Sequence, residues 1–523
     1  MTRTYRRTAA ALIGPFLLLA SAGLSAQAWK SDQGDGTYRN PPLNADYPDP
    51  DIIRVGGDFY FATTTFANVP GLTILKSRDL INWRIATHVV PKLTGSDRYD
   101  LADGGAYRKG IYAPSLRYHQ GRFYAVYTPV GQNSRIYSAP AIEGPWTMAE
   151  LDREAFDPGL FFDTDGKGYI VTAYSGGTGD ITLLSLDDSY SRVTGAQTIH
   201  HIKGGEGSKL VRRGDWYYLF NAIPSRLGLT VSRAKSLTGP WETRNQIDDT
   251  TGGHQGAIVD LPDGTDVGFV MLDAGAIGRV TNISPIFWQD GWPVWGTKDA
   301  PGRVPASARK PVQGQSFVEP PTSDEFTETT LGLQWQWNHN PDDTRWSLSE
   351  RPGYLRLKAT RADEFWLAKN TLIQKGQAPR SEAVVKLDTR GLRAGDQCGF
   401  GTLGKFNGQI AIVPEGSGRQ RLAMRLVEDG RDGRVTHDGA SGPLMPAGML
   451  WLRTRMDFTN DKAQLAYSRN GRTWTDLGAP FPLAYDWRTG TFQGPQYALS
   501  CYNAAPNGGY LDVDWFHFSG WQP

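Results

Sequence analysis

Short runs of alternating hydrophobic and polar residues fill this chain, and five stretches share one pattern. Each stretch begins with a small or polar residue, continues as an apolar strand, passes through a polar turn and returns as an aromatic strand. The stretches begin at Asp49, Ala113, Asp157, Glu206 and Gln255. Alternation between turn residues predicts a β-hairpin in each stretch. The hairpins recur about every 50 residues, a period typical of propellers and solenoids.

The hairpins are followed by a third strand and, in four of the five, by a Trp-bearing edge, as in "LTILKSRDLINW" and "LTVSRAKSLTGPW". Four strands per repeat and five repeats predict a five-bladed β-propeller over residues 29–300. The first strand of each blade lines the central channel, so Asp49, Asp157 and Glu206 are expected to share one pocket. A single Asp-Pro or Glu-Gly pair would indicate only a turn. Three acids in one register, facing a common axis, indicate a catalytic site instead.

The second half of the chain has a different pattern. Residues 301–316 are rich in Pro, Gly, Ala and charge without periodicity, which predicts a linker. Residues 317–523 carry many short alternating strands such as "SEAVVKLD" and "YLDVDWFHF", which predict a β-sandwich or jelly roll. Trp335, Trp337 and Trp346 lie close together there, either as a sugar platform or, more commonly in sandwiches, as core or interdomain packing. The fold class is therefore all-β.

The first 28 residues have the form of a secretory signal peptide. Arg3, Arg6 and Arg7 precede an apolar run, and "AQA" ending at Ala28 is a small-x-small cleavage site. The apolar run is too short for a membrane anchor and is broken by Pro15. The Arg6-Arg7 pair also allows twin-arginine export. We therefore expect an exported, periplasmic or secreted protein without a membrane partner.

The composition excludes one class of partner and leaves the cysteines open. The net charge is +1 and the Lys and Arg residues are dispersed, so nucleic acid is not an expected partner. The 17 Trp and 22 Tyr residues suit an all-β protein that stacks on a ring-shaped ligand. Cys398 and Cys501 could pair in an exported protein, or they could be buried small hydrophobic residues. Nothing in the pattern indicates an oligomeric state.

Three acids in one pocket suit the hydrolysis of a glycosidic bond. One carboxylic acid protonates the leaving oxygen, and a second carboxylate activates water or attacks the anomeric carbon. A third acid nearby raises the pKa of the first, because like charges disfavour joint ionisation. Glu206 has the longer side chain and lies among glycines, which suits the general acid. Asp49, between two prolines, suits the orientation of water, and Asp157 remains as the pKa modulator.

The motifs "YPDPDIIRVGGDFYFATTTF", "FDPGLFFDTDGKGYIV", "EGSKLVRRGDWYYLF" and "GRVTNISPIFWQDGWPVW" resemble those of glycoside hydrolase family 43. This family contains inverting five-bladed-propeller β-xylosidases and α-L-arabinofuranosidases. The resemblance covers residues 39–296, and the block at 323–343 is similar to the concanavalin-like C-terminal sandwich of exo-acting members. It implies the same three roles: general base for Asp49, pKa modulator for Asp157 and general acid for Glu206.

The resemblance implies further site residues. His254 corresponds to the family's axial histidine, often near a calcium ion in the channel, and Arg279 to an arginine that contacts the substrate. Phe66 and Tyr112 resemble the aromatic residues of the sugar subsite, although many relatives have Trp where this chain has Tyr112. Gln255, the fifth opener, is a further candidate for substrate binding.

The chemistry implied by the three acids requires no cofactor, but a structural calcium ion would suit two sites. One is the channel near His254. The other lies in the sandwich, where Asp324 and Asp514 could meet if the first and last strands adjoin, because calcium prefers carboxylate and carbonyl oxygens.

The expected function is therefore exo-acting, inverting release of terminal β-D-xylosyl or α-L-arabinofuranosyl residues from plant hemicellulose oligosaccharides. Three alternatives remain: an arabinan-directed hydrolase, a retaining β-fructosidase and a non-catalytic sugar-binding propeller. The β-fructosidase is disfavoured because its nucleophile segment reads Asn-Asp-Pro-Asn-Gly, whereas this chain has "YPDPDII". The binding propeller is disfavoured because all three acids are present. The sequence does not distinguish xylose from arabinofuranose.

Overall fold

The computed structural model describes residues 28–522 except 108, 175, 248–252, 319, 431–432, 438, 488–491 and 507. The predicted signal peptide lies outside the described residues apart from Ala28. The described chain consists of strands and short 3-10 turns, and none of its helices is long and apolar enough to cross a membrane. The turns are η1 (Asp97–Asp100), η2 (Ala102–Gly104), η3 (Pro224–Arg226), η4 (Gly275–Ile277) and η5 (Phe365–Leu367).

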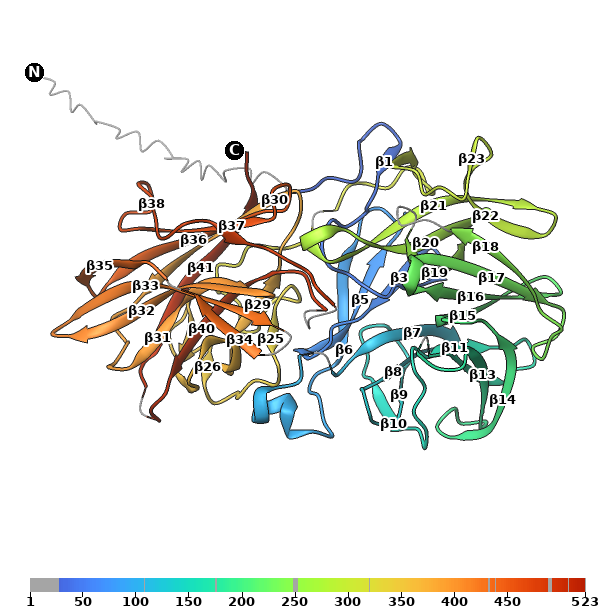
Figure 1. Cartoon of the computed structure of the whole chain (residues 1–523), viewed down its shortest axis with the longest axis horizontal. Coiled ribbons are helices and arrows are strands. Elements are labelled where there is room, and N and C mark those ends of the chain that lie inside the picture. Colours follow the sequence, from blue (N-terminus) through green and yellow to red (C-terminus); the bar gives the residue numbers. More distant parts are fainter. Residues whose placement is uncertain are drawn as a thin grey trace, which may run out of the picture.

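Five antiparallel sheets surround one axis in the first half of the chain, which confirms the predicted propeller (Figure 1). Blade 1 contains β2 (Asp51–Val55), β3 (Asp58–Thr63), β5 (Gly71–Ser77) and β6 (Arg84–Val90). Blade 2 contains β7 (Tyr112–His119), β8 (Arg122–Thr128), β9 (Arg135–Ala139) and β10 (Thr147–Glu150). Blade 3 contains β11 (Gly159–Phe162), β12 (Gly168–Thr172), β13 (Asp180–Leu186) and β14 (Val193–His201).

Blade 4 contains β15 (Glu206–Arg213), β16 (Trp216–Ile223), β17 (Gly228–Ala234) and β18 (Glu242–Ile247). Blade 5 contains β19 (His254–Asp260), β20 (Asp266–Asp273), β21 (Arg279–Gln289), β22 (Trp292–Thr297) and β23 (Ala300–Pro301). The first strands contact one another in a closed circle, β2 to β7, β11, β15, β19 and back to β2. They therefore line the channel, as the repeat predicted.

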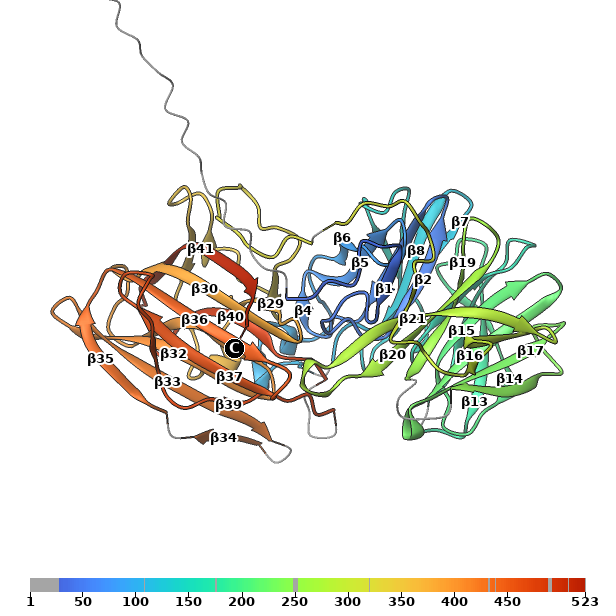
Figure 2. The ribbon, with the colours of Figure 1, turned by 90° about the horizontal axis from the view of Figure 1, so that it is seen from above.

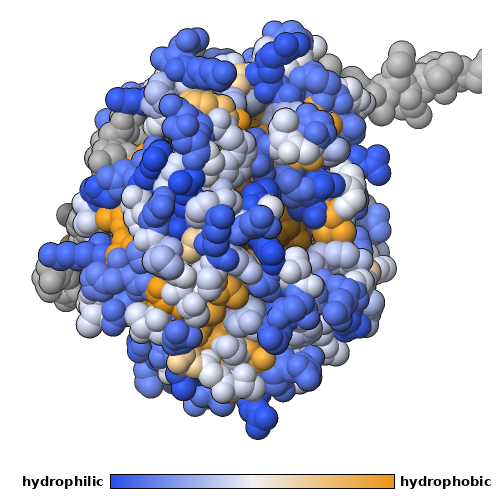
Figure 3. All heavy atoms as spheres, turned by 90° about the vertical axis from the view of Figure 1, so that its right-hand side faces the viewer, coloured by the Kyte–Doolittle hydropathy of each residue, from blue (hydrophilic) through white to orange (hydrophobic). Residues whose placement is uncertain are grey.

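Polar contacts join neighbouring blades along these inner strands. Four are ion pairs: Arg117 with Asp51 at 2.8 Å, Arg212 with Asp163 at 2.7 Å, Arg213 with Asp266 at 2.7 Å, and Arg54 with Asp260. In addition, the His119 ring stacks on the Phe162 ring, with 4.4 Å between their centroids. The inner strands also enclose a cavity of about 340 Å³ in this part of the channel. The end of the propeller that faces the viewer in Figure 3 is covered mainly by hydrophilic residues, with hydrophobic ones in small separate patches.

The start of the propeller is fastened to blade 5 and to the segment that follows it. β1 (Thr37–Arg39) pairs with β24 (Ser307–Arg309), which lies within the residues expected to form the linker. The side-chain amide of Asn40 donates to the carbonyl oxygens of Ile283 and Pro305 at 2.8 and 2.7 Å. These contacts hold the segment that leads to Asp49 in place beside blade 5.

Two sheets form the predicted sandwich in the second half of the chain. The first contains β34 (Gly433–His437), β33 (Arg419–Gly430), β32 (Phe406–Gly416), β31 (Asp396–Leu403), β40 (Gln496–Asn503), β29 (Leu372–Lys375), β25 (Gln336–Asn338), β28 (Thr360–Arg361) and β35 (Ser441–Pro446). The second contains β26 (Trp346–Ser347), β27 (Leu355–Lys358), β41 (Tyr510–Gly520), β30 (Arg380–Asp388), β36 (Met449–Asp457), β37 (Lys462–Ser468), β38 (Thr475–Asp476) and β39 (Phe481–Pro482).

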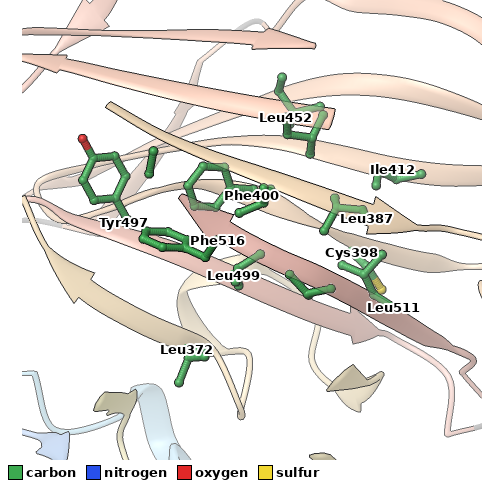
Figure 4. Packing of buried hydrophobic residues seen from close by; sticks show 14 of the residues in the cluster. Leu372, Leu387, Cys398, Phe400, Ile412, Leu452, Tyr497, Leu499, Leu511 and Phe516 are labelled. Carbon is green, nitrogen blue, oxygen red and sulfur yellow. The ribbon is translucent and has the colours of Figure 1, made fainter. Parts of the chain in front are cut away.

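A continuous hydrophobic core lies between these sheets, with Phe400, Tyr497 and Phe516 among its aromatic members (Figure 4). Cys398 and Cys501 lie opposite each other on β31 and β40 and form a disulfide, which resolves the question that the sequence left open. Trp335 and Trp337 are buried in the core, and Trp346 packs on Trp337. The tryptophan cluster is therefore packing and not a sugar platform.

The two domains lie side by side and share backbone pairing (Figures 1 and 2). β4 (Asn68–Val69), from the propeller, pairs with β25 and so extends the first sheet of the sandwich. Beside it, the Tyr107 ring stacks on Trp366 at 3.7 Å, and the Ala106 backbone N–H donates to His339 Nε2 at 2.7 Å. The sandwich thus holds the segment between η2 and β7, which leads to Tyr112.

Candidate active site

A left-handed residue marks the same position at the start of the inner strand in every blade. The positive φ angles are 55° at Asp49, 31° at Ala113, 45° at Asp157, 58° at Gly207 and 48° at Gln255. Side chains rarely adopt this conformation, and it concentrates at functional sites. Glu206 therefore lies one residue before the position equivalent to Asp49 and Asp157. The sequence had placed all three acids in one register, so this detail of the prediction was wrong.

The physical reason lies in Gly207 and in the bulge at the strand start. Glycine adopts positive φ without steric cost, so the left-handed residue in blade 4 is the glycine. Strand pairing is irregular at this point, between Glu206 and Lys209 in blade 4 and between His254 and Gly256 in blade 5. Bulges of this kind re-aim side chains next to active sites. Glu206 consequently reaches the site from a different backbone position than the two aspartates.

Asp49 is held by donors on both carboxylate oxygens. Its Oδ1 accepts a hydrogen bond from Arg279 Nη1 at 2.9 Å, and its Oδ2 accepts one from Thr64 Oγ1 at 2.6 Å. Asp49 and Arg279 are 4% and 6% exposed, so both charges are buried and paired. Burial disfavours the charged guanidinium of Arg279, but Asp49 and the other acidic groups around it together outweigh this effect, and the pKa of Arg279 is raised. Arg279 therefore remains a cation at every relevant pH.

The electrostatics of Asp157 show that the three acids share one site. Burial raises the pKa of Asp157 well above its ordinary value, and the negative charges of Glu206 and Asp49 raise it further. The positive charges of Lys209 and Arg279 act in the opposite direction without cancelling the rise. Like charges in one pocket disfavour joint ionisation. Asp157 therefore keeps its proton to higher pH than an isolated carboxyl does.

Aromatic rings from both domains form one wall of the site. Phe66 and Tyr112 meet edge to face at 5.0 Å, as expected if both belong to the sugar subsite. Phe492, from the sandwich, lies 5.8 Å from Phe66 and 6.1 Å from Tyr112 between ring centroids. The Arg279 guanidinium lies 5.6 Å from the Phe66 ring and 5.6 Å from the Phe492 ring. The sandwich therefore contributes directly to the site.

Gln255 and His254 lie beside the acids on blade 5. Gln255 is 2% exposed, and its side chain packs against the backbone of Gly207. His254 Nε2 lies 3.3 Å from Asp273 Oδ1. Gln255 Nε2 and His254 Nδ1 are buried and have no hydrogen-bond partner among the described residues. The roles of Gln255 in substrate binding and of His254 in the channel stay predictions.

The described residues contain no group of three His, Cys, Asp or Glu side chains placed to hold a metal ion. Asp324 Oδ2 accepts from Trp335 Nε1 at 2.8 Å, and its Oδ1 accepts from the backbone of Phe326 at 2.8 Å. Asp514 Oδ2 pairs with Lys386 Nζ at 2.6 Å. Each predicted sandwich ligand thus has protein partners of its own. Calcium binding at Asp324 and Asp514, and in the channel near His254, stays a prediction.

Several residues of the site carry no signal in the sequence. Thr64 follows the first hairpin and holds Asp49, and its Oγ1 also accepts from the backbone N–H of Ala113 at 2.6 Å. Tyr485 of the sandwich lies within the electrostatic reach of Arg279, and burial raises its pKa. Phe492 and Asp46 also belong to the site: Phe492 meets Phe66 across the domain seam, and Asp46 accepts from the backbone of Arg279 within the propeller and from Gly494 across the seam.

Fold and site together indicate a glycosidase: a propeller with three acidic residues at its inner strands, an arginine paired with one of them and an aromatic cluster beside that arginine. The models of glycosyl hydrolases family 43 and of the β-xylosidase C-terminal concanavalin A-like domain match residues 38–293 and 323–519. The chain belongs to glycoside hydrolase family 43.

Curated relatives and solved structures agree with this assignment. A β-xylosidase of Formosa agariphila is 29% identical over 553 residues, which cover 93% of this chain and 91% of the relative. A non-reducing end α-L-arabinofuranosidase of Bacteroides ovatus is 33% identical over 358 residues, covering 62% of this chain and 65% of the relative. A solved structure of a family 43 enzyme, engineered to display both endo-xylanase and exo-arabinofuranosidase activity, is 30% identical in sequence and superposes with a TM-score of 0.84. The superposition covers 93% of this chain and 100% of that enzyme.

Proposed function

We propose that this enzyme releases terminal β-D-xylosyl or α-L-arabinofuranosyl residues from hemicellulose oligosaccharides, with inversion at the anomeric carbon. The observation that carries the proposal is that the three predicted acids lie at or just before the starts of inner strands that form one closed circle. Burial raises the pKa of Asp157, and the negative charges of Glu206 and Asp49 raise it further, which supports a shared pocket. Relatives named as β-xylosidase and as α-L-arabinofuranosidase support both sugars. The acids provide the chemistry without a cofactor.

In the proposed mechanism each side chain has one task. Asp49 accepts a proton from the attacking water, and Arg279 and Thr64 keep its carboxylate in one orientation. Glu206 donates a proton to the leaving oxygen on the opposite face of the sugar. Asp157 disfavours the ionised form of Glu206 through its own negative charge. Phe66, Tyr112 and Phe492 supply an apolar wall against which a sugar ring can pack.

Exo action is supported by the enclosure of the site. Asp49 is 4% and Asp157 9% exposed, and the sandwich places Phe492 against the propeller aromatics. The small exposed fractions of both acids suit a pocket that takes the end of a chain rather than an open cleft that a chain crosses. We also propose that residues 1–28 direct export and are removed, which would place the enzyme where extracellular polysaccharide is available. Mass spectrometry of the exported protein reads its first residue, and retention of Met1 would contradict this part.

The anomer formed first tests the proposed function. If Asp49 activates water, its carboxyl and that of Glu206 are about 6.5–9.5 Å apart, rather than the roughly 5 Å of a retaining pair. A β-xyloside should then yield α-xylose, which proton NMR detects before mutarotation. β-Xylose as the first product, or transfer to an added alcohol, would indicate a covalent intermediate on Asp49. Relative kcat/KM on aryl β-xyloside and aryl α-L-arabinofuranoside decides which sugar is preferred.

Asp157→Asn should lower activity at alkaline pH and stabilise the fold. Removing the charge beside Glu206 lets the coupled proton leave at lower pH, so the alkaline limb of the kcat/KM profile moves to lower pH. The pKa of Asp is about 3.9 in the unfolded state and is raised in the folded state. Ionising this carboxyl in the folded protein therefore lowers the free energy of unfolding as the pH rises above about 3.9. The variant should therefore have a higher Tm than wild type at pH 7, and this difference should vanish below about pH 4.

Asp165→Asn is the matched control, because Asp165 lies exposed in the turn of the same blade and pairs with Lys167. It should change neither the pH profile nor the response of Tm to pH beyond a small shift. An alkaline limb that stays in place in Asp157→Asn would show that Asp157 orients the substrate and does not modulate Glu206.

A further inference from the structure

Asp46 is a buried acid three residues before the proposed base, at the seam between the two domains. It is 4% exposed. Its Oδ1 accepts a hydrogen bond from the backbone N–H of Arg279 at 2.9 Å. Its Oδ2 accepts one from the backbone N–H of Gly494, in the sandwich, at 3.1 Å. One carboxylate therefore bridges blade 5 and the sandwich.

Each end of this bridge leads to a residue of the site. Arg279, whose backbone Asp46 holds, donates through Nη1 to Asp49 Oδ1 at 2.9 Å. Gly494 follows Phe492 by two residues, and the Phe492 ring lies 5.6 Å from the Arg279 guanidinium. Asp46 thus contacts both the residue that orients the base and the segment that carries the aromatic wall.

Two glycines beside Asp46, Gly278 and Gly494, have no room for a side chain. A Cβ atom on Gly278 would lie 2.5 Å from Asp46 Oδ1, and one on Gly494 would lie 1.9 Å from the carbonyl oxygen of Ile277. Cβ atoms in proteins do not approach other atoms so closely. Any other residue at either position would therefore force the backbone away from Asp46 or from Ile277. The seam is therefore built around the carboxylate of Asp46.

Charge on the sandwich side matches the acid. Lys375, on β29, is partly buried, and its Nζ lies 5.1 Å from the centroid of the Tyr47 ring. Burial raises the pKa of Asp46, while the positive charges of Lys375 and Arg279 oppose the rise. Burial likewise lowers the pKa of Lys375, and the charge of Asp46 opposes that change. Buried polar groups are costly unless they are hydrogen-bonded, and the backbone N–H groups of Arg279 and Gly494 meet this need for Asp46 at the seam.

We propose that Asp46 is a positioning residue through which docking of the sandwich orients Arg279, and thereby Asp49, for activation of water. In this arrangement the segment bearing Phe492 and the cation that holds the base are set by one carboxylate. The enclosure of the sugar and the orientation of the base are then established together. Asp46 itself touches neither the substrate nor the attacking water. The inference rests on the proposed role of Asp49 as general base.

The test compares Asp46→Asn with Asp32→Asn in the full-length protein. Asn keeps one oxygen that can accept a hydrogen bond, but its NH2 group cannot accept one. Asp46→Asn therefore loses the hydrogen bond from either the Arg279 N–H or the Gly494 N–H. Asp32 is a buried acid paired with Lys310 at 2.6 Å, at the seam between the N-terminal segment and residues 301–316. It controls for the loss of a buried, paired charge without contact to Arg279 or Asp49. Both variants should have a lower Tm than wild type.

Only Asp46→Asn should change catalysis. We expect kcat to fall about 10- to 100-fold, with KM changed less than threefold, because a misplaced reacting group costs rate more than binding. Gly494→Ala, which disturbs the same hydrogen bond from the sandwich side without changing charge, should lower kcat in the same way.

Three outcomes would overturn the proposal. One is a kcat equal to that of wild type in both Asp46→Asn and Gly494→Ala, which would make Asp46 a stability residue like Asp32. Another is a rise in KM alone, which would mean that the seam acts only through Phe492. The third is loss of kcat in Asp32→Asn as well. Failure of the proposed function is distinguishable from these, because the first-formed anomer is measured on the wild-type enzyme.

Discussion

Glu206→Gln should abolish cleavage of unactivated xylo- or arabino-oligosaccharides while sparing aryl glycosides with good leaving groups. A general acid contributes about 10²–10⁴-fold where the leaving alcohol needs a proton. A nitrophenolate-type leaving group departs with little protonation, so its loss in rate should be much smaller. The measurement is kcat/KM on an oligosaccharide and on an aryl glycoside of the same sugar, for wild type and variant. The ratio between the two substrates, and not either rate alone, identifies the acid.

Glu242→Gln is the matched control for this experiment. Glu242 lies in the same blade on the outer strand β18, and its side chain is 63% exposed and pairs with Arg233 at 3.2 Å. The control should leave both rates unchanged, because an exposed ion pair contributes little to stability and does not reach the channel. Equal losses on the two substrates in Glu206→Gln would remove Glu206 from the acid role and assign it to substrate binding.

The repeat predicted the architecture because each blade is a local unit. Its hairpins read directly from alternation and turn residues, and first strands must converge once the circle closes. That argument placed Asp49, Asp157 and Glu206 in one site before any contact was known. It missed the register of blade 4, since only the backbone shows that Gly207, and not Glu206, takes the left-handed position. An opener motif cannot reveal which of two adjacent residues has positive φ.

The other residues of the site were missed because their contacts join distant segments. Phe492 and Gly494 meet Phe66 and Asp46 only through docking of the sandwich, and neither lies in a motif. Asp46 stands beside "YPDPD", but an acid in such a segment reads as a turn residue. The cysteines show the same limit, since their pairing depends on the register of β31 against β40. Local pattern predicts elements, whereas the seam between domains depends on the fit of side chains.

Asp49→Asn should be severe on every substrate, whatever the leaving group. Activation of water is required in each turnover, and an amide cannot accept the proton, so kcat should fall by about 10²–10⁴-fold on oligosaccharide and aryl glycoside alike. The fold should remain intact, because the amide oxygen can still accept a hydrogen bond from Arg279 Nη1 or Thr64 Oγ1. The contrast with Glu206→Gln, which separates the two substrates, distinguishes base from acid within one set of assays.

Asp58→Asn controls for loss of an acid in blade 1, because Asp58 lies at the start of β3 and pairs with Lys76 at 2.8 Å. It should retain wild-type rates on both substrates. If Asp49→Asn kept substantial hydrolysis of the aryl glycoside, the base would be another residue. Asp157 would then be the candidate, since it is the other aspartate of the coupled site, and its position beside Glu206 would imply a different path for the water. Two results together would support activation of water by Asp49. Aryl glycoside cleavage would be lost in Asp49→Asn but not in Glu206→Gln or Asp58→Asn, and the wild-type enzyme would form the inverted product first.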